Sequence, residues 1–344
     1  MYIYEEFDKG MITLRKLIKS REMGMLYMLI VLCVIISVGN PVFLRIDNIM
    51  DLIRSNLVLC ITAIGLLLPV LTGGIDVSIS ATIAFVTVVV GKFLINVSSN
   101  VFLAFLLGCL VGMCLGLING VIIAKIKIPP IVATLGTMTI TNGVMRLWMK
   151  GMLINNLPEE FISFGKFRFF EVQTSQGGIT GIPVQVLILT GVVFVTWVVL
   201  KYTLIGRSIY AIGGNPVSAQ RIGYNVDKTI LFIYTYAGLL SGLAGVVSTS
   251  IMRQVDQKAF TGYELTVVAA VVLGGVNIAG GNGTLFGTIL GVIFLSIINN
   301  GLILLHIPTF WQQIVIGVII VIAASSDALR VRYEESKLKK IDID

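Results

Sequence analysis

The sequence predicts an all-α polytopic membrane protein, a bundle of about ten transmembrane helices with broken or re-entrant segments. Of the 344 residues, 56% are hydrophobic and only 12% are charged, whereas soluble domains carry about 25% charged residues. The apolar residues form runs close to the roughly 20 residues that a helix needs to cross a bilayer. These runs lack the alternation of apolar and polar residues that membrane β-strands require. Helices are therefore the structure that can satisfy the backbone in lipid.

Ten apolar runs are candidate spans, and together they define a membrane domain over residues 25–327. We interpret the first run as a retained span, because it is long and no A-x-A-like cleavage site follows it. The runs cover residues 25–44, 57–72, 78–97, 101–124, 130–149, 184–203, 229–251, 264–275, 284–304 and 310–327.

Lysine and arginine residues indicate the orientation of the bundle. When the N-terminus is placed in the cytoplasm, sixteen of the 25 Lys and Arg residues fall in segments on that side and nine on the other. Cytoplasmic segments carry an excess of these residues. Both tails, 1–24 and the basic tail 328–344, are therefore expected to be cytoplasmic. The same distribution attributes the net charge of +7 to membrane topology and argues against nucleic acid as a partner.

Two segments on the outer side carry distinct patterns. Residues 41–56 place Ile46, Ile49 and Ile53 at helical spacing between charged residues, which predicts a short helix lying at the membrane surface. Residues 150–183 form the longest segment outside the membrane and are rich in phenylalanine. We expect this external loop either to dock a soluble partner or to pack over the helix bundle.

Glycines at four-residue spacing mark two of the runs. They are Gly108, Gly112, Gly116 and Gly120 in the fourth run, and Gly283, Gly287 and Gly291 in the ninth. Small residues on one helix face allow two backbones to approach closely in lipid. Both patterns predict helix packing rather than contact with a solute.

Three polar interruptions lie between apolar halves, at residues 71–80, 133–143 and 273–287. Irregular backbone is tolerated at membrane depth where it is buried in protein or lines a cavity. The interruptions therefore predict the wall of a translocation pathway. The candidate pathway residues are Gly73, Gly74, Asp76, Ser78, Thr134, Thr137, Asn277 and Asn282.

Asp76 has two interpretations. A carboxylate at membrane depth is costly and indicates a functional site by default. Asp76 also precedes the start of the third apolar run, where its oxygens can accept hydrogen bonds from free backbone N–H groups. The position before a helix start favours the structural role.

Residues 206–228, GRSIYAIGGNPVSAQRIGYNVDK, are polar and basic and separate two long apolar runs. In so hydrophobic a chain they must project into water, so they predict a docking surface. The chain contains no G-x-x-x-x-G-K-[ST] loop, so it has no phosphate-binding loop of that kind. The single histidine, His306, has no carboxylate and nucleophile near it in sequence, and the four cysteines show no CxxC spacing. The sequence thus predicts neither an enzyme nor a metal site.

Four ordered motifs resemble the inner-membrane permeases of bacterial ABC importers of the ribose, xylose and autoinducer-2 type. They are Gly73 to Ser78 (GGIDVS), Ile128 to Thr137 (IPPIVATLGT), Gly206 through Pro216, and Leu273 through Gly281. The resemblance covers about residues 45–327. Local motifs such as 127–135 and 305–308 look most similar to autoinducer-2 permeases, and ribose permeases are similar through the same stretches. One departure is Ser80, where the family often has glycine.

The resemblance implies a type II ABC importer fold in the bacterial inner membrane and a set of partners. These are cytoplasmic ATPase subunits that hold ATP and Mg²⁺, an extracytoplasmic sugar-binding protein, and a second permease copy, identical or not. The chain itself then needs no cofactor. Within the cytoplasmic loop 204–228, the resemblance identifies a coupling helix capped after Asn215 and Pro216, with Val217, Ala219 and Ile222 presented to a groove on the ATPase. The coupling residues are Gly213, Gly214, Asn215, Pro216, Ala219, Ile222 and Gly223.

The expected function is the membrane subunit of an ATP-driven importer of a neutral sugar such as a pentose or autoinducer-2. The candidate pathway offers hydroxyl and amide groups rather than paired charges, as a neutral solute requires. An ion-coupled secondary transporter of a small polar solute is the alternative, although such coupling usually recruits several buried carboxylates. A membrane scaffold or receptor without transport is a third possibility.

Overall fold

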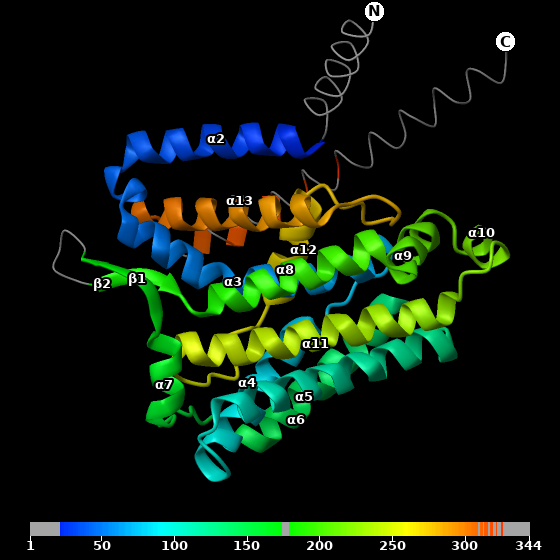
Figure 1. Cartoon of the computed structure of the whole chain (residues 1–344), viewed down its shortest axis with the longest axis horizontal. Coiled ribbons are helices and arrows are strands. Elements are labelled where there is room, and N and C mark those ends of the chain that lie inside the picture. The colour runs from blue at the N-terminus through cyan, green and yellow to red at the C-terminus, as the bar shows by residue number, and fades with distance from the viewer. Residues whose placement is uncertain are drawn as a thin grey trace, which may run out of the picture.

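The computed structural model describes residues 21–173 and 179–308, with isolated positions between 310 and 325. In chain order the elements are α2 (Arg21–Gly39), the 3-10 helix η1 (Pro41–Leu44), α3 (Ile46–Leu71), α4 (Ile79–Asn96), α5 (Val101–Val121), the π-helix η2 (Ile122–Ile126), α6 (Pro130–Met149), α7 (Glu159–Lys166), β1 (Arg168–Gln173), β2 (Ile179–Pro183), α8 (Gln185–Tyr202), α9 (Leu204–Gly214), α10 (Pro216–Arg221), α11 (Val226–Met252), α12 (Tyr263–Leu273) and α13 (Leu285–Leu304). The long helices lie side by side (Figure 1), with α7 and the β1–β2 hairpin at one end of the bundle and α10 at the other.

The helical membrane bundle is confirmed, but the predicted count of ten spans is not. Among the described residues six helices are long and apolar enough to cross a membrane, namely α3, α4, α5 with η2, α8, α11 and α13. Two further apolar helices, Met23–Gly39 and Tyr263–Leu273, are shorter. α6 has the bounds predicted for the fifth run, 130–149, but is not among the six. The tenth run, 310–327, and both tails lie largely outside the described residues.

α3 and α11 form the centre of the bundle. Every residue of α3 from Leu57 to Leu71 is buried, and α11 packs against α3, α4 and α5. The α11–α5 contact is built from the predicted glycines. A Cβ atom on Gly112 would lie 2.6 Å from Cα of Gly242, and one on Gly116 would lie 2.8 Å from Cα of Gly238. The packing role is therefore confirmed for this face, because the two backbones touch where side chains are missing.

The packing role predicted for the glycines of the ninth run is confirmed for two of the three. A Cβ atom on Gly291 of α13 would lie 2.7 Å from the backbone nitrogen of Gly274, at the end of α12. Gly287 faces the same partner. Gly283, however, precedes α13 and has a φ of +154°, so it belongs to the turn before the helix and does not extend the packing face.

The separate surface helix predicted over 41–56 is wrong. Ile46 starts α3, which continues without a break to Leu71. No glycine or proline occurs between residues 46 and 64, so nothing in the sequence ends the helix there. The turn to it comes earlier, at η1, where Asn40 accepts a hydrogen bond from the Val42 N–H and donates one to the Leu304 carbonyl. Residues 46–56 are the first turns of a helix that is long and apolar enough to cross a membrane.

The external segment 150–183 is packed against the bundle at α7 and exposes side chains of the β1–β2 hairpin. Phe161 is fully buried, and a Cβ atom on Gly165 would collide with the Ser250 carbonyl oxygen of α11. The antiparallel β1–β2 hairpin is the one departure from an all-α fold among the described elements. Phe170 at its edge is 83% exposed. The segment therefore packs over the bundle at α7 and leaves Phe170 and Val172 of β1 exposed.

Candidate functional site

The loop predicted to dock a partner folds into two short helices. Thr203 caps α9 by accepting a hydrogen bond from the Gly206 N–H at 3.1 Å. Asn215 ends α9 and caps α10, its side-chain oxygen accepting from the Ser218 N–H at 2.9 Å. Pro216 occupies the first position of α10, where the missing N–H costs no hydrogen bond. The sequence prediction of a short capped helix after Asn215 and Pro216 is confirmed.

The outward face of α10 differs from the predicted one. Val217 and Ile222 are 59% and 72% exposed, whereas Ala219 is 1% exposed. Residues two apart lie on opposite sides of a helix, so Val217 and Ala219 cannot both face a partner. Ala219 instead anchors α10 to this chain, and its carbonyl accepts the Tyr224 N–H. The expectation that Ala219 enters a partner's groove is corrected.

The glycines of this loop have two different settings. A Cβ atom on Gly213 would collide with the Leu71 carbonyl oxygen, and the Gly281 N–H donates to that same oxygen at 2.9 Å. Gly213 therefore packs where α9 meets the end of α3 and the turn before α13. Gly214 and Gly223 face open space, and Gly223 has a φ of +96°. Gly223 thus permits the turn that follows α10.

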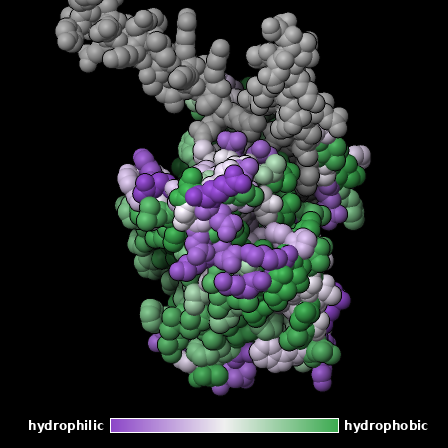
Figure 2. Space-filling model, turned by 90° about the vertical axis from the view of Figure 1, so that its right-hand side faces the viewer, coloured by the Kyte–Doolittle hydropathy of each residue, from purple (hydrophilic) through white to green (hydrophobic). Residues whose placement is uncertain are grey.

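A cavity of about 630 Å³ lies between α10, the start of α11 and Lys127. Pro216, Val217 and Gln220 line its α10 side, and residues 223–227 line the other. Figure 2 shows hydrophilic side chains gathered in a band across this end of the molecule, with hydrophobic surface around them. The geometry can receive a protruding element of a water-soluble partner.

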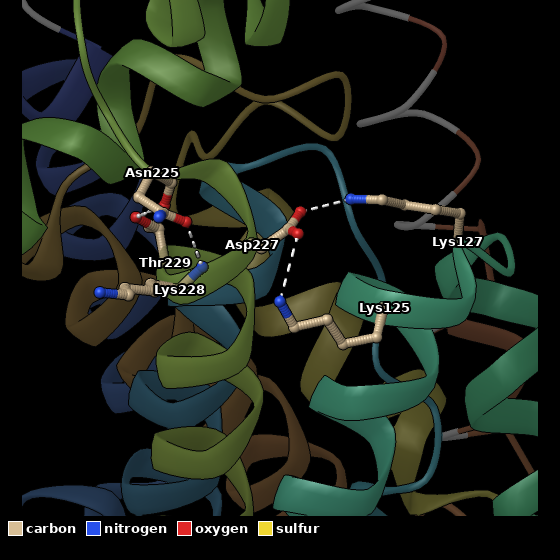
Figure 3. Close-up of polar contacts among 6 residues, drawn as sticks. All are labelled: Lys125, Lys127, Asn225, Asp227, Lys228 and Thr229. Atoms are coloured by element: carbon tan, nitrogen blue, oxygen red, sulfur yellow. Dashed lines mark hydrogen bonds and ion pairs between the residues drawn. The ribbon is translucent and has the colours of Figure 1, made fainter.

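An ion-pair cluster fixes one wall of this cavity (Figure 3). Asp227 at the start of α11 pairs with Lys127, and with Lys125 at 3.5 Å. Lys125 lies in η2, and Lys127 follows it with a φ of 66°. Asn225 caps α11 by accepting from the Lys228 N–H at 2.9 Å. The cluster therefore joins the end of α5 to the start of α11 beside α10.

Sequence reasoning missed this cluster. It counted Lys125 and Lys127 only as markers of topology. The available signal was that the predicted loops 125–129 and 204–228 lie on the same side of the membrane, and that Asp227 is the single acidic residue in the second loop while the first carries two lysines. A buried hydrogen bond between the hydroxyls of Ser208 and Thr229, 2.9 Å apart, ties α9 to α11 in the same region.

Part of the predicted pathway forms a buried polar cluster at the start of α4. Asp76 is 2% exposed, and its Oδ1 accepts from the N–H and hydroxyl of Ser78 at 2.9 and 2.6 Å. Asn119 of α5 donates to the Ser78 hydroxyl at 2.8 Å. These bonds hold the backbone turn that leads into α4. They favour the structural interpretation of Asp76, since its known partners organise the helix start.

Gly74 and Thr134 are brought to the same cluster. The Thr134 hydroxyl donates to the Ile75 carbonyl at 3.3 Å, and a Cβ atom on Gly74 would collide with the Tyr234 hydroxyl. The Thr137 hydroxyl, one turn along α6, donates to the Thr134 carbonyl at 3.1 Å. Gly73 lies apart from this cluster. A Cβ atom on Gly73 would lie 3.1 Å from the Ala279 carbonyl oxygen.

Asn277 and Asn282 organise a separate turn. The Asn277 N–H donates to the Asn282 carbonyl at 2.9 Å, and the Asn277 side-chain oxygen accepts from the Ala279 N–H at 3.0 Å. Their contacts are thus local to the turn between α12 and α13. The structure therefore divides the predicted pathway residues between two places.

Comparisons with known proteins agree with the membrane architecture and the ordered motifs. Residues 48–324 match the family described as branched-chain amino acid transport system permease component. No solved structure matches the chain.

Three relatives illustrate the similarity. The ribose import permease protein RbsC of Bacillus subtilis is 38% identical over 89% of this chain and 92% of its own length. RbsC of Haemophilus influenzae is 36% identical over 87% and 90%. The autoinducer 2 import system permease protein LsrC of Klebsiella pneumoniae is 32% identical over 89% and 86%. The local motifs looked most similar to autoinducer-2 permeases, whereas over the whole chain these ribose permeases are the more similar. The chain therefore belongs to the family of branched-chain amino acid transport system permease components.

Proposed function

We propose that this chain is the membrane-spanning permease subunit of an ATP-driven importer in the bacterial inner membrane, and that its cargo is a neutral sugar. The named relatives support the cargo class, because they are permeases for ribose and autoinducer 2. ATP and Mg²⁺ are bound by separate ATPase subunits, since the sequence has no phosphate-binding loop of the G-x-x-x-x-G-K-[ST] kind.

The observation that carries the proposal is the end of the molecule formed by α10. This helix presents exposed Val217 and Ile222 while Ala219 anchors it from behind. The Asp227 ion pairs hold the neighbouring wall of the cavity. A rigid helix held at both its cap and its buried face can pass a push from a partner into α9 and α11, because packed elements move as units. We assign α10 as the contact for the ATPase.

The orientation follows from this assignment. The end with α10 is cytoplasmic, in agreement with the Lys and Arg distribution. The opposite end, with α7 and the β1–β2 hairpin, then faces the solute-binding protein. Exposed Phe170 and Val172 on that hairpin give a soluble partner an apolar surface to contact. A second permease subunit completes the assembly.

The proposal is tested by purifying the tagged full chain from its native membrane with single cysteines for crosslinking. Val217→Cys and Ile222→Cys are the probes, and Val172→Cys on the hairpin, also exposed, is the matched control. We expect an ATPase subunit to co-purify and to crosslink through residues 217 and 222 but not through 172. Purification of the intact chain alone, with no ATPase even after mild crosslinking, would contradict the proposal.

A further inference from the structure

A second cavity, of about 500 Å³, lies between α4, α6 and the segment that leads into α12. Its volume falls within the roughly 300–1,000 Å³ typical of small-molecule sites. None of the pathway residues predicted from the sequence lines it. Ser80 stands at its α4 side, Asn142 at its α6 side, and Gln257 and Glu264 on the third side.

Two of these side chains carry buried acceptors without a partner. Gln257 Oε1 and Glu264 Oε2 make no hydrogen bond within the described part of the chain. Buried polar atoms in native proteins are almost always hydrogen-bonded, so each exception calls for an explanation. Two acceptors on one cavity wall match a ligand that brings hydroxyl donors. The amide of Asn142, on the facing helix, supplies both a donor and an acceptor.

The apolar part of the cavity wall can contact the C–H groups of such a ligand. Phe260 is 5% exposed and is held edge-on against Tyr263, with ring centroids 5.2 Å apart. Ala81 and Ala84 face the cavity from α4 and leave it room. An aromatic ring in the same cavity as polar groups fits a molecule with apolar C–H faces and a polar hydroxyl edge.

Charges of both signs line the cavity, so neither a cation nor an anion meets only attraction there. Arg146 and Lys258 line it and are exposed, so they repel a cation from the approach. Glu264 lines it with a buried oxygen, so it opposes an anion. A neutral solute rich in hydroxyl groups meets neither penalty.

The cavity also lies directly beside the buried polar cluster of Asp76. Ser80 is two residues beyond Ser78, and Met138, which lines the cavity, is one turn or about 6 Å along α6 from Thr134. The turn from Gly74 to Ser78 thus lies next to the cavity without lining it. Asp76 holds the shape of this turn through Ser78.

We infer that this cavity binds the transported solute within the membrane, and that Asn142, Gln257 and Glu264 contact its hydroxyl groups. The inference rests on the proposed function, which supplies the neutral sugar. It shifts solute contact away from the sequence-predicted residues Gly73 to Ser78, which here support the wall.

The test uses the complete importer in proteoliposomes, with D-ribose as the probe. Asn142→Ala and Gln257→Ala are made singly and together, and Asn96→Ala, an exposed amide on α4 outside the cavity, is the matched control. Loss of one hydrogen bond of ordinary strength weakens binding of the solute by about fivefold. We expect each single variant to lower the ATP-dependent uptake rate by about that factor, the double variant by more, and the control by none.

A labelling experiment keeps the inference testable if the uptake variants assemble poorly. Thr261 is exposed and lines the cavity, so Thr261→Cys, in a chain whose native cysteines are replaced, should be modified by a polar thiol reagent from outside. D-Ribose should slow this modification and leave that of Asn96→Cys unchanged. Two results would contradict the inference and leave the proposed function intact. One is that the variants transport at the normal rate. The other is that D-ribose gives no protection while the wild type transports it. If the wild-type importer takes up no D-ribose, the same measurements are made with the neutral sugar that it does take up, and a wild-type importer that takes up no neutral sugar contradicts the sugar assignment and the inference with it.

Discussion

At the scale of single residues, Asp76 and Ala219 are both buried and both make their contacts within this chain. Asp76 was expected at depth beside a helix start, and it lies there with Ser78 as its partner. Ala219 was expected in the coupling helix, and it is there but faces the bundle. A six-residue helix carries too little periodicity to reveal which face is covered, because the covering residues come from distant parts of the chain.

The hydrogen bonds of Asp76 give a prediction that separates charge from geometry. Asp76→Asn keeps the side-chain oxygen that accepts from Ser78, so it should fold nearly as the wild type. Asp76→Leu leaves buried donors without an acceptor, and we expect a loss of about 1–3 kcal/mol in the free energy of unfolding. Thermal unfolding of the detergent-solubilised chain measures both. Equal stability of the Leu variant and the wild type would refute the structural role of Asp76.

At the scale of elements, boundaries were predicted well where a breaker marks them. α6 begins at Pro130 and ends at Met149, as expected, because a proline pair and a glycine border it. The start of α3 was missed because charged residues were interpreted as the mark of a surface helix. Asp51 and Arg54 instead lie in the first turns of a helix that then enters the bundle, and the Arg54 side chain donates to the Ile251 carbonyl at 3.2 Å.

The α5–α11 contact predicts that substitution of two glycines by leucine changes the melting temperature by very different amounts. Gly112→Leu must push the helices apart, because the added side chain meets the backbone at Gly238 and Gly242. Overpacking of this kind costs about 1–3 kcal/mol or more. Gly191→Leu on α8 is the control, since nothing lies within 4 Å of its Cβ position. The melting temperature should fall for Gly112→Leu and stay within error for Gly191→Leu, and equal shifts would discard the packing account.

At the scale of the whole molecule, composition was sufficient for the helical membrane bundle and ordered motifs were sufficient for the family. The candidate site was only partly predictable. Polar breaks in apolar runs marked Gly74, Asp76, Ser78 and Thr134, which do meet. The cavity beside them was predicted only in part: Ser80 and Asn142 lie in two of the predicted polar interruptions, whereas its third side, with Gln257 and Glu264, comes from a segment that no interruption covers. No local pattern in the sequence brings that segment to the other two.

The central claim is that ATP hydrolysis by partner subunits moves a neutral sugar through this chain. Its most direct test is uptake of a panel of neutral sugars, beginning with D-ribose, into proteoliposomes that contain the complete assembly and its binding protein. Ionophores collapse the proton and sodium gradients throughout. We predict uptake that requires ATP and the binding protein and survives the ionophores. Uptake that continues without ATP and stops with the ionophores would contradict the claim and identify an ion-coupled transporter instead.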